Sequence, residues 1–485
     1  MDHITRVRVR NVRAIRSLDL ELGRPLTVLI GENGSGKSTL VECLQLLRLA
    51  AETSFTRHFF DEHRGLVGLL RAGESSMGLG VVIEDDAGVE PTLDYQIVLS
   101  RERTHIEISL ERLLVGPTAT LNAGVQDEAE AADLEARGTE RRSAARTRAS
   151  AVPARGARLS KEHIAVVAQG VLEAQALIER AEQLRRGMGA KAAVPLVALE
   201  RSGFDGKRVG ASALLISAHT SDSSQLIAPG VTDVVPGDAF RRLNGALRGI
   251  EVHIGFDTLA TWANRTYRRP ETVRGPATLF PAERLQLRAT NLASCWAELR
   301  NQSHARWTET LDLVRLGLGD RLDTVSVPPD GGGGSVYLAV KFHDLPHAVL
   351  ASDLSDGQLA WLAFVAMARL NPSRSLLVVD EPELHLHPAL LGRVVALLAN
   401  LEGGARALVS THSDRVLEML DDPVDAVRVC QLDDGVASVA RIDGAELPGW
   451  LEQFGDVGQL RAAGYLGRVL VPAEPVAVNR GEETK

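Results

Sequence analysis

The stretch Gly31-Glu-Asn-Gly-Ser-Gly-Lys-Ser-Thr39 decides the fold of this chain. It fits the phosphate-loop pattern G-x-x-x-x-G-K-[ST]. Residues 26–30 (Leu-Thr-Val-Leu-Ile) precede it as an apolar run that predicts a buried strand, and residues 40–47 follow it with the apolar spacing of a helix. Because strand, glycine-rich loop and helix occur in the order that the motif requires, a chance glycine-rich turn is a poor explanation.

The loop predicts a nucleotide site. Its glycines let backbone N–H groups turn toward phosphates, and the helix N-terminus adds a partial positive charge. We expect Lys37 to reach the β- and γ-phosphates, Ser38 to ligate Mg²⁺ and Thr39 to contact the α-phosphate. ATP and Mg²⁺ are therefore the expected cofactors. The residues predicted to contact the nucleotide are Asn33, Gly34, Ser35, Gly36, Lys37, Ser38 and Thr39.

The composition is that of an ordinary soluble protein. The chain has 485 residues, of which 45% are hydrophobic and 24% charged, and its net charge is −9. This charge does not favour nucleic-acid binding by the whole molecule, so DNA would need a local basic patch. Three widely spaced cysteines predict a reducing compartment without a disulfide framework. Without a signal-like apolar core or a run of about 18 apolar residues, we expect a cytoplasmic protein with no membrane partner.

Strand signals surround the phosphate loop. Residues 5–10 alternate strictly, with Val7 and Val9 expected inward and three arginines outward, and residues 15–22 predict a second strand. The arginines (Arg6, Arg8 and Arg10) could bind DNA phosphates or simply form a solvated strand face. Three further strands are predicted as an antiparallel sheet beside the core, at residues 80–83, 95–99 and 105–110.

Residues 116–274 predict an accessory insertion. Their composition shifts near residue 117 to an acidic, alanine-rich segment and then to a basic one that favours a flexible linker. Residues 161–186 and 240–247 have helical spacing, and residues 194–199 indicate a strand. Aromatic and basic residues also mix at 262–269, which suits either a nucleic-acid surface or ordinary packing.

Three short motifs follow in the C-terminal half. Leu354-Ser-Asp-Gly-Gln358 precedes an apolar helix, so Ser355, Gly357 and the helix N-terminus could bind an anion, although a helix N-cap explains the pattern equally well. The apolar strand in residues 375–379 leads to Asp380 and Glu381. We expect Asp380 to hold Mg²⁺ through water and Glu381 to orient or deprotonate the attacking water.

The third motif is Ala407-Leu-Val-Ser-Thr-His412, an apolar strand that ends in a histidine. Its position after the Asp-Glu strand predicts that His412 senses the γ-phosphate. Between these strands, His385 and His387 invite a metal interpretation. Because their spacing is i, i+2 and no third ligand is nearby, an interface role is the better explanation.

Together the motifs resemble the ATP-binding-cassette superfamily, in particular the SMC-like branch with RecF, the OLD-family nucleases and the ATPase subunit of Septu-type phage-defence systems. The run Asp-Glu-Pro-Glu-Leu-His-Leu-His-Pro and the opening Arg-Asn-Val-Arg-Ala-Ile are similar to those proteins. The resemblance covers residues 3–115 and 275–435. It implies an α/β fold, an ABC-type P-loop ATPase head with a mixed β-sheet lobe and a helical accessory insertion.

The resemblance also implies how the site is completed. Lys37 and Asp380 of one subunit would face Ser355 of another in a head-to-head ATP dimer or a higher oligomer, and Arg13 would join the nucleotide contacts. The expected domains are residues 1–115 and 275–445 for the ATPase head, 116–274 for the insertion and 446–485 for a C-terminal tail. Two departures stand out. Asp356 occupies a position where transporters usually have glycine, and Gln96 is only a candidate for the family's Q-loop.

Function is open between several alternatives. OLD-family nucleases carry a further domain of about a hundred residues, for which the chain has too little room after residue 435, so intrinsic nuclease activity is not expected. We expect a Mg²⁺-dependent ATPase that regulates a separate effector, such as a nuclease, in antiviral defence. A RecF-like repair ATPase with ATP-dependent DNA binding is the alternative. A transporter ATPase is disfavoured by the large insertion and by Asp356.

Overall fold

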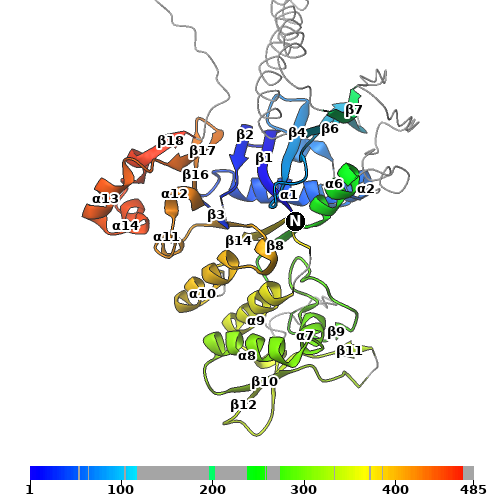
Figure 1. Cartoon of the computed structure of the whole chain (residues 1–485), viewed down its shortest axis with the longest axis vertical. Coiled ribbons are helices and arrows are strands. Elements are labelled where there is room, and N and C mark those ends of the chain that lie inside the picture. Colours follow the sequence, from blue (N-terminus) through cyan, green and yellow to red (C-terminus); the bar gives the residue numbers. More distant parts are fainter. Residues whose placement is uncertain are drawn as a thin grey trace, which may run out of the picture.

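A 13-stranded mixed sheet forms the centre of the molecule (Figure 1). Its strand order is β7-β6-β5-β4-β1-β2-β17-β16-β3-β15-β14-β8, and β18 pairs with β17. The expected α/β class with a mixed β-sheet is thereby confirmed. The computed structural model describes residues 1–23, 25–52, 55–63, 65–102, 105–116, 196–202, 238–256, 258, 273–331, 334–370, 373–384 and 386–472.

One half of the sheet is antiparallel. Its central strand β1 alternates as predicted, because Val7 and Val9 are fully buried while Arg10 is exposed. Successive turns join β1 to β2 and β4 to β5 to β6, and this local connectivity makes the pairing antiparallel. The strands of this half are β1 (Asp2–Val12), β2 (Ile15–Glu21), β4 (Ser76–Asp85), β5 (Thr92–Glu102), β6 (His105–Gly116) and β7 (Leu196–Ser202).

The other half contains the parallel strands that hold the motifs. Strands β16, β3, β15, β14 and β8 are parallel neighbours, whereas β17 runs antiparallel to β16. The mostly apolar sequences of β3, β14 and β15 suit burial on both faces. The strands are β3 (Leu26–Gly31), β8 (Ile250–Ile254), β14 (Leu376–Asp380), β15 (Ala407–Thr411), β16 (Val427–Asp433), β17 (Val436–Ile442) and β18 (Leu470–Pro472).

In the strand pairing, a single residue pair joins the two halves, and one further backbone hydrogen bond links the Ile4 amide of β1 to the Ser375 carbonyl oxygen before β14 (3.2 Å). Ile15 of β2 pairs with Ala437 of β17, in parallel orientation, and the Ala437 amide donates to the Ala14 carbonyl oxygen at 2.8 Å. By contrast, β1 and β2 pair through six positions from Arg6 to Val12. The sheet is therefore continuous in hydrogen bonding but narrow at this junction.

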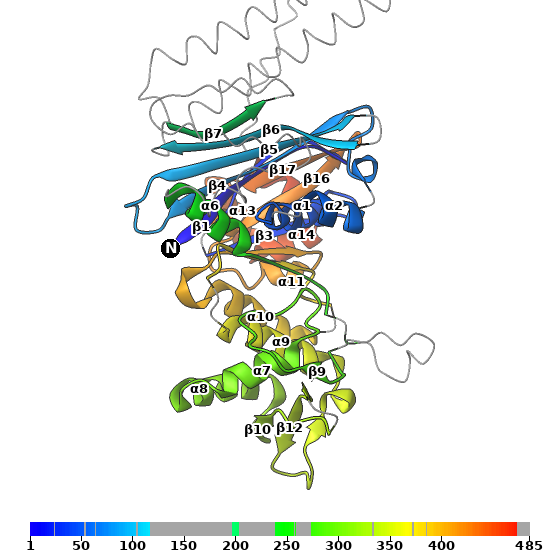
Figure 2. The same cartoon turned by 90° about the vertical axis from the view of Figure 1, so that its right-hand side faces the viewer.

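Helices cover the sheet in two hydrophobic clusters. Apolar side chains of α1, α2 and α6 pack in one cluster with the antiparallel strands and with residues of β8 and β14, and those of α7 to α11 pack in the other cluster with the parallel strands. Figure 2 shows α1 and α6 beside the sheet and α7 to α9 below it, in a lower lobe. The helices are α1 (Lys37–Leu49), α2 (Phe55–His63), α6 (Asp238–Arg248), α7 (Leu292–Arg300), α8 (His304–Leu318), α9 (Asp356–Arg369), α10 (Pro388–Ala399), α11 (Asp414–Leu417) and α12 (Pro423–Ala426).

Short strands complete the lower lobe. They form a three-stranded sheet, β10-β12-β13, and a two-stranded sheet, β11-β9. A 3-10 turn, η3 (Ala351–Asp353), leads from β13 into α9. The strands are β9 (Ala277–Thr278), β10 (Leu322–Ser326), β11 (Ser335–Val336), β12 (Ala339–Phe342) and β13 (Val349–Leu350).

Two segments outside the expected ATPase halves join this architecture. Residues 196–202 and 250–254, which fall in the range expected as an insertion, supply the two terminal strands β7 and β8 of the large sheet. Residues 447–472 form α13 (Leu447–Phe454), α14 (Val457–Ala462), η5 (Leu466–Val469) and β18, which pairs with β17. The helix expected at 161–186 and the mixed segment at 262–269 lie outside the described residues.

Candidate functional site

The phosphate loop lies where β3 ends and α1 begins. Gly34 and Gly36 have φ angles of 82° and 96°, a left-handed conformation that favours glycine. Gly36 is the N-cap of α1, no side chain caps the helix, and the first turn contains no acidic residue. The first amides and the positive end of the helix dipole are therefore suited to an anion. Ser38, in the first turn, is exposed.

Lys37 lies over this loop, with its side chain almost fully buried. Its Nζ donates to the carbonyl oxygens of Gly31 and Glu32 at 2.9 and 2.8 Å. Burial lowers the pKa of the Lys37 ammonium, while Glu381 and Asp380 are among the nearby acids that raise it. The two carboxylates are thus close enough to act electrostatically on Lys37, so the fold brings these three predicted residues together.

Asp380 ends β14 at the carboxyl edge of the parallel strands. Its Oδ1 accepts a hydrogen bond from Ser410 Oγ of the neighbouring strand β15. A carboxylate and the hydroxyl of Ser38 are hard oxygen ligands of the kind that Mg²⁺ prefers. The residues present therefore fit the expected Mg²⁺ site.

Glu381 and His412 face each other from neighbouring strand ends. His412 Nε2 lies 3.4 Å from Glu381 Oε1. The Glu381 amide donates to the Ser410 carbonyl oxygen at 2.8 Å, which continues the sheet pairing by one residue. Both side chains are about one-third exposed, so they could reach a water molecule or a phosphate.

A further carboxylate, Glu383, supports the histidine loop. Its Oε1 accepts from Thr411 Oγ1 at 2.7 Å and from the His412 amide at 2.9 Å. Sequence reasoning named Glu383 only as part of the motif run and gave it no role. Its contacts lie 28 and 29 residues away, so no local pattern could reveal them.

The second motif forms a capped helix start in the lower lobe. Ser355 Oγ accepts from the Gln358 amide at 3.3 Å, and Gln358 Oε1 accepts from the Ser355 amide at 2.9 Å. The sequence leaves the helix N-cap open between Ser355 and Asp356, and this reciprocal capping box shows that it is Ser355. Ser355 is exposed and Gly357 half-buried, so the cap leaves the helix start accessible.

Arg13 has a different partner from the one that the resemblance implies. Its guanidinium forms a two-pronged ion pair with Glu42 of α1, at 2.5 and 3.1 Å, and its Nε donates to the Gly68 carbonyl oxygen. These contacts hold Arg13 beside the helix that follows the phosphate loop. A nucleotide contact by Arg13 stays a prediction.

The other sequence-derived candidates have ordinary structural partners. Arg6 pairs with Asp19, and Arg8 pairs with Asp94 and Asp19, so carboxylates neutralise part of the arginine strip. Gln96, the Q-loop candidate, lies on β5 and donates to Asp94.

Of the two histidines between the carboxylate motif and α10, only one can be placed. His387 caps α10 through Nδ1, and His385 lies outside the described residues. Within the described ranges, no group of three or more His, Cys, Asp or Glu residues is arranged to hold a metal.

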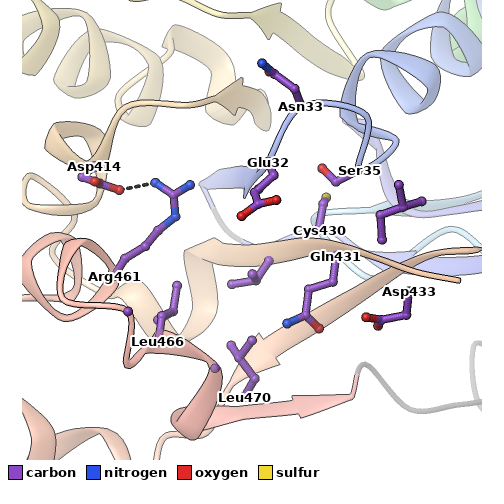
Figure 3. Close-up of a pocket in the computed structure, with 15 residues that line it drawn as sticks. Glu32, Asn33, Ser35, Asp414, Cys430, Gln431, Asp433, Arg461, Leu466 and Leu470 are labelled. Carbon is purple, nitrogen blue, oxygen red and sulfur yellow. Dashed lines mark hydrogen bonds and ion pairs between the residues drawn. The ribbon is translucent and has the colours of Figure 1, made fainter. Parts of the chain in front are cut away.

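A pocket of about 600 Å³ borders the first half of the phosphate loop (Figure 3). Strand β16 and the C-terminal segment form its other walls. Arg461 of α14 lines it and pairs with Asp414, two residues after His412. Lys37 and Asp380 do not line this pocket, so it adjoins the phosphate site rather than containing it. The lining residues labelled in the figure are Glu32, Asn33, Ser35, Asp414, Cys430, Gln431, Asp433, Arg461, Leu466 and Leu470.

Two family models match this chain, each over a different part of the sequence. A model described as "AAA domain, putative AbiEii toxin, Type IV TA system" matches residues 211–418, and one described as "AAA domain" matches residues 6–58. The first range contains the signature, carboxylate and histidine motifs, and the second contains the phosphate loop. Both models describe AAA-type ATPase domains, as expected for a P-loop ATPase. For the described residues, no helix is long and apolar enough to cross a bilayer.

Solved SMC head domains are similar over most of the chain. One is from Pyrococcus furiosus, with an extended coiled coil and bound to the C-terminal domain of ScpA, at 10% identity and a TM-score of 0.42, covering 93% of this chain and 99% of that one. Another SMC head, bound to the C-terminal winged-helix domain of ScpA, has 10% identity and a TM-score of 0.45. The match covers 92% of this chain and 99% of that one. The SMC head domain from Thermotoga maritima has 10% identity and a TM-score of 0.38. The match covers 91% of this chain and 99% of that one.

Proposed function

We propose that this P-loop ATPase binds ATP and Mg²⁺ between two copies of the chain and uses the closed dimer to regulate a separate effector, a nuclease, in antiviral defence. One arrangement carries the proposal. Lys37, Asp380 and Glu381 gather at the carboxyl edge of the parallel strands, whereas the exposed Ser355 starts α9 in the lower lobe (Figure 2). A site divided in this way is completed by the lower lobe of a second copy.

In this mechanism, each residue acts on a defined part of ATP. The loop amides and the Lys37 ammonium bind the β- and γ-phosphates. Ser38 and Asp380 would hold Mg²⁺, which supplies positive charge against the phosphate oxygens when bound. Glu381 orients or deprotonates the attacking water, and His412, 3.4 Å from Glu381, contacts the γ-phosphate. Hydrolysis removes the phosphate that both subunits bind, so the dimer opens.

The partner proposal rests on the resemblance of the motifs to OLD-like and Septu-type ATPases, and so does the choice of antiviral defence. In this proposal, the chemistry that ATP controls belongs to another chain.

To test the proposal, the Glu381→Gln protein is expressed from its native operon and purified together with any bound partner. The mass of the purified particle is then measured with and without ATP. Glutamine keeps the shape of the side chain but is a poor base, so ATP-bound dimers should accumulate. A matched control is Glu452→Gln on the exposed side of α13, which should behave like the wild type. A stable complex with a second, nuclease-like chain supports the proposal. A bare ATP-dependent dimer that binds gapped DNA would favour the repair alternative, and no dimer would refute both.

A further inference from the structure

A buried arginine holds the loop that leads to the signature helix. Arg274 is only 5% exposed and lies just before β9, far from α9 in sequence. Its guanidinium donates to four acceptors at the start of α9 and in the loop before it, and to one after β8. They are Thr258 O (2.7 Å) for Nε, the carbonyl oxygens of Ala351 (3.2 Å), Ser352 (3.1 Å) and Leu354 (2.5 Å) for Nη1, and Asp356 Oδ1 (2.5 Å) for Nη2.

These contacts account for the unusual residue in the signature motif. A buried guanidinium must have its N–H groups satisfied, and an unpaired buried charge is costly. The Asp356 carboxylate provides the only side-chain acceptor among those five contacts, and it forms an ion pair with Arg274. A glycine at residue 356 could not provide it. Aspartate at this position thus belongs to the arginine contact rather than to the nucleotide contact.

The same arginine links the signature loop to the strand beside the carboxylate motif. Thr258, which accepts from Arg274 Nε, follows β8 by four residues. In β8, Ile254 is in register with Asp380 of β14. Phe256, which lies between Ile254 and Thr258 in the sequence, packs edge-on against Phe364 of α9 with ring centroids 5.1 Å apart. Arg274 therefore connects the start of α9 to the strand that borders Asp380.

We propose that Arg274 is a positioning residue that fixes the loop before α9 and so orients Ser355 toward the nucleotide of a second copy. The inference rests on the proposed ATP dimer and adds to it a residue outside every sequence motif. Because the guanidinium binds three loop carbonyls and one carboxylate at once, lysine cannot replace it. Ser355 remains exposed while the loop behind it is held from inside.

The test uses the full chain carrying Glu381→Gln, with and without Arg274→Lys. Light scattering with and without ATP measures dimer formation, and a fluorescent ATP analogue measures nucleotide affinity in dilute monomer. We expect Arg274→Lys to weaken ATP-dependent dimerisation by at least about tenfold while nucleotide affinity changes by less than about threefold. Arg300→Lys, on an exposed position in the last turn of α7, is the matched control and should leave both values unchanged.

Asp356 provides a milder second variant. Asp356→Ala removes one acceptor and leaves the carbonyl contacts of Arg274, so it should fold even where Arg274→Lys does not. It should weaken the dimer, and Asp356→Asn, which keeps an oxygen acceptor, should recover most of the loss. Unchanged dimerisation in both Asp356→Ala and Arg274→Lys would overturn the inference. So would a loss of ATP affinity in the monomer as large as the loss of dimerisation. Absence of a dimer in Glu381→Gln alone would instead refute the proposed function.

Discussion

His412 Nε2 lies 3.4 Å from Glu381 Oε1, across the carboxyl ends of β15 and β14. Glu381 has a φ angle of 51°, a left-handed conformation that is unusual for a residue other than glycine or asparagine. In this conformation its backbone N–H donates a hydrogen bond to the Ser410 carbonyl oxygen at 2.8 Å. The backbone strain thus coincides with the residue predicted to act on water, which is where strain is often found.

Replacing His412 by alanine should slow hydrolysis without preventing nucleotide binding. The variant loses the imidazole next to Glu381, so kcat should fall about 10- to 100-fold, within the range of a lost proton-transfer or phosphate contact. ATP affinity should stay within about threefold of the wild type, because the phosphate loop is intact. Phosphate release and equilibrium binding measure the two quantities. A variant with normal kcat would remove His412 from the mechanism.

Glu383 should matter through the backbone of the histidine loop. Glu383→Ala removes the acceptor for Thr411 Oγ1 and the His412 amide, so His412 loses its fixed position and kcat should drop about tenfold. Glu383→Gln retains an oxygen acceptor and should stay within about threefold of the wild-type kcat. Equal kcat losses in the two variants would contradict a positioning role and point to the charge instead.

Gly31 should not tolerate even a methyl group. A Cβ at this position would lie 2.2 Å from the Cys430 carbonyl oxygen and 2.8 Å from Ser35 Oγ, in the pairing of β3 with β16. We expect Gly31→Ala to lower the free energy of unfolding by roughly 1–3 kcal/mol and to weaken ATP binding. Gly68→Ala, where a Cβ meets no atom within 4 Å, is the control. Urea unfolding measures the free energy of unfolding of both variants. If Gly31→Ala were as stable as Gly68→Ala, strands β3 and β16 would be able to move apart and accommodate the methyl group.

Acid should destabilise the fold through a buried pair beside β14. Burial by itself would raise the pKa of Glu251, but Arg374 and His253 outweigh it and lower the pKa to about 2. Because the folded pKa is below the ordinary value of 4.5, the stabilisation is complete above pH 4.5 and is lost as the pH falls toward 2. Its size is about 3 kcal/mol.

The pH dependence of unfolding tests this pair. Urea titrations of the wild type between pH 5 and pH 2 should show the loss, and Glu251→Gln should be less stable at pH 7 and show a smaller decline toward acid. The exposed Glu452→Gln variant should follow the wild-type curve. Parallel curves for wild type and Glu251→Gln would contradict the assignment to Glu251.

The sequence predicted those parts of the site that depend on local pattern. Residues 26–30 and 40–47 indicated the strand and helix around the phosphate loop, and the structure has β3 and α1 there. The strands before Glu381 and His412 were equally clear, because short apolar runs that end in a polar residue are typical of buried parallel strands.

Contacts between distant segments could not be predicted in the same way. Arg274 and Asp356 are 82 residues apart, and neither lies in a pattern that marks the other as its partner. Residues 250–254 (Ile-Glu-Val-His-Ile) could not be placed either, since a short alternating segment does not show which sheet it joins. A tail was expected from residue 446, but its helical turns are short and give no sustained period.

The single residue pair between β2 and β17 places the phosphate loop at the junction of the two halves of the sheet. Arg71 lies over this joint and donates to the carbonyl oxygens of Ala14 and Gly435 at 2.9 and 3.1 Å. A Cβ on Gly36 would be 3.1 Å from the Ala437 side chain and 3.6 Å from Cγ1 of Ile15, so the loop rests against both members of the pair. Any side chain larger than hydrogen at residue 36 would therefore meet both halves of the sheet at once.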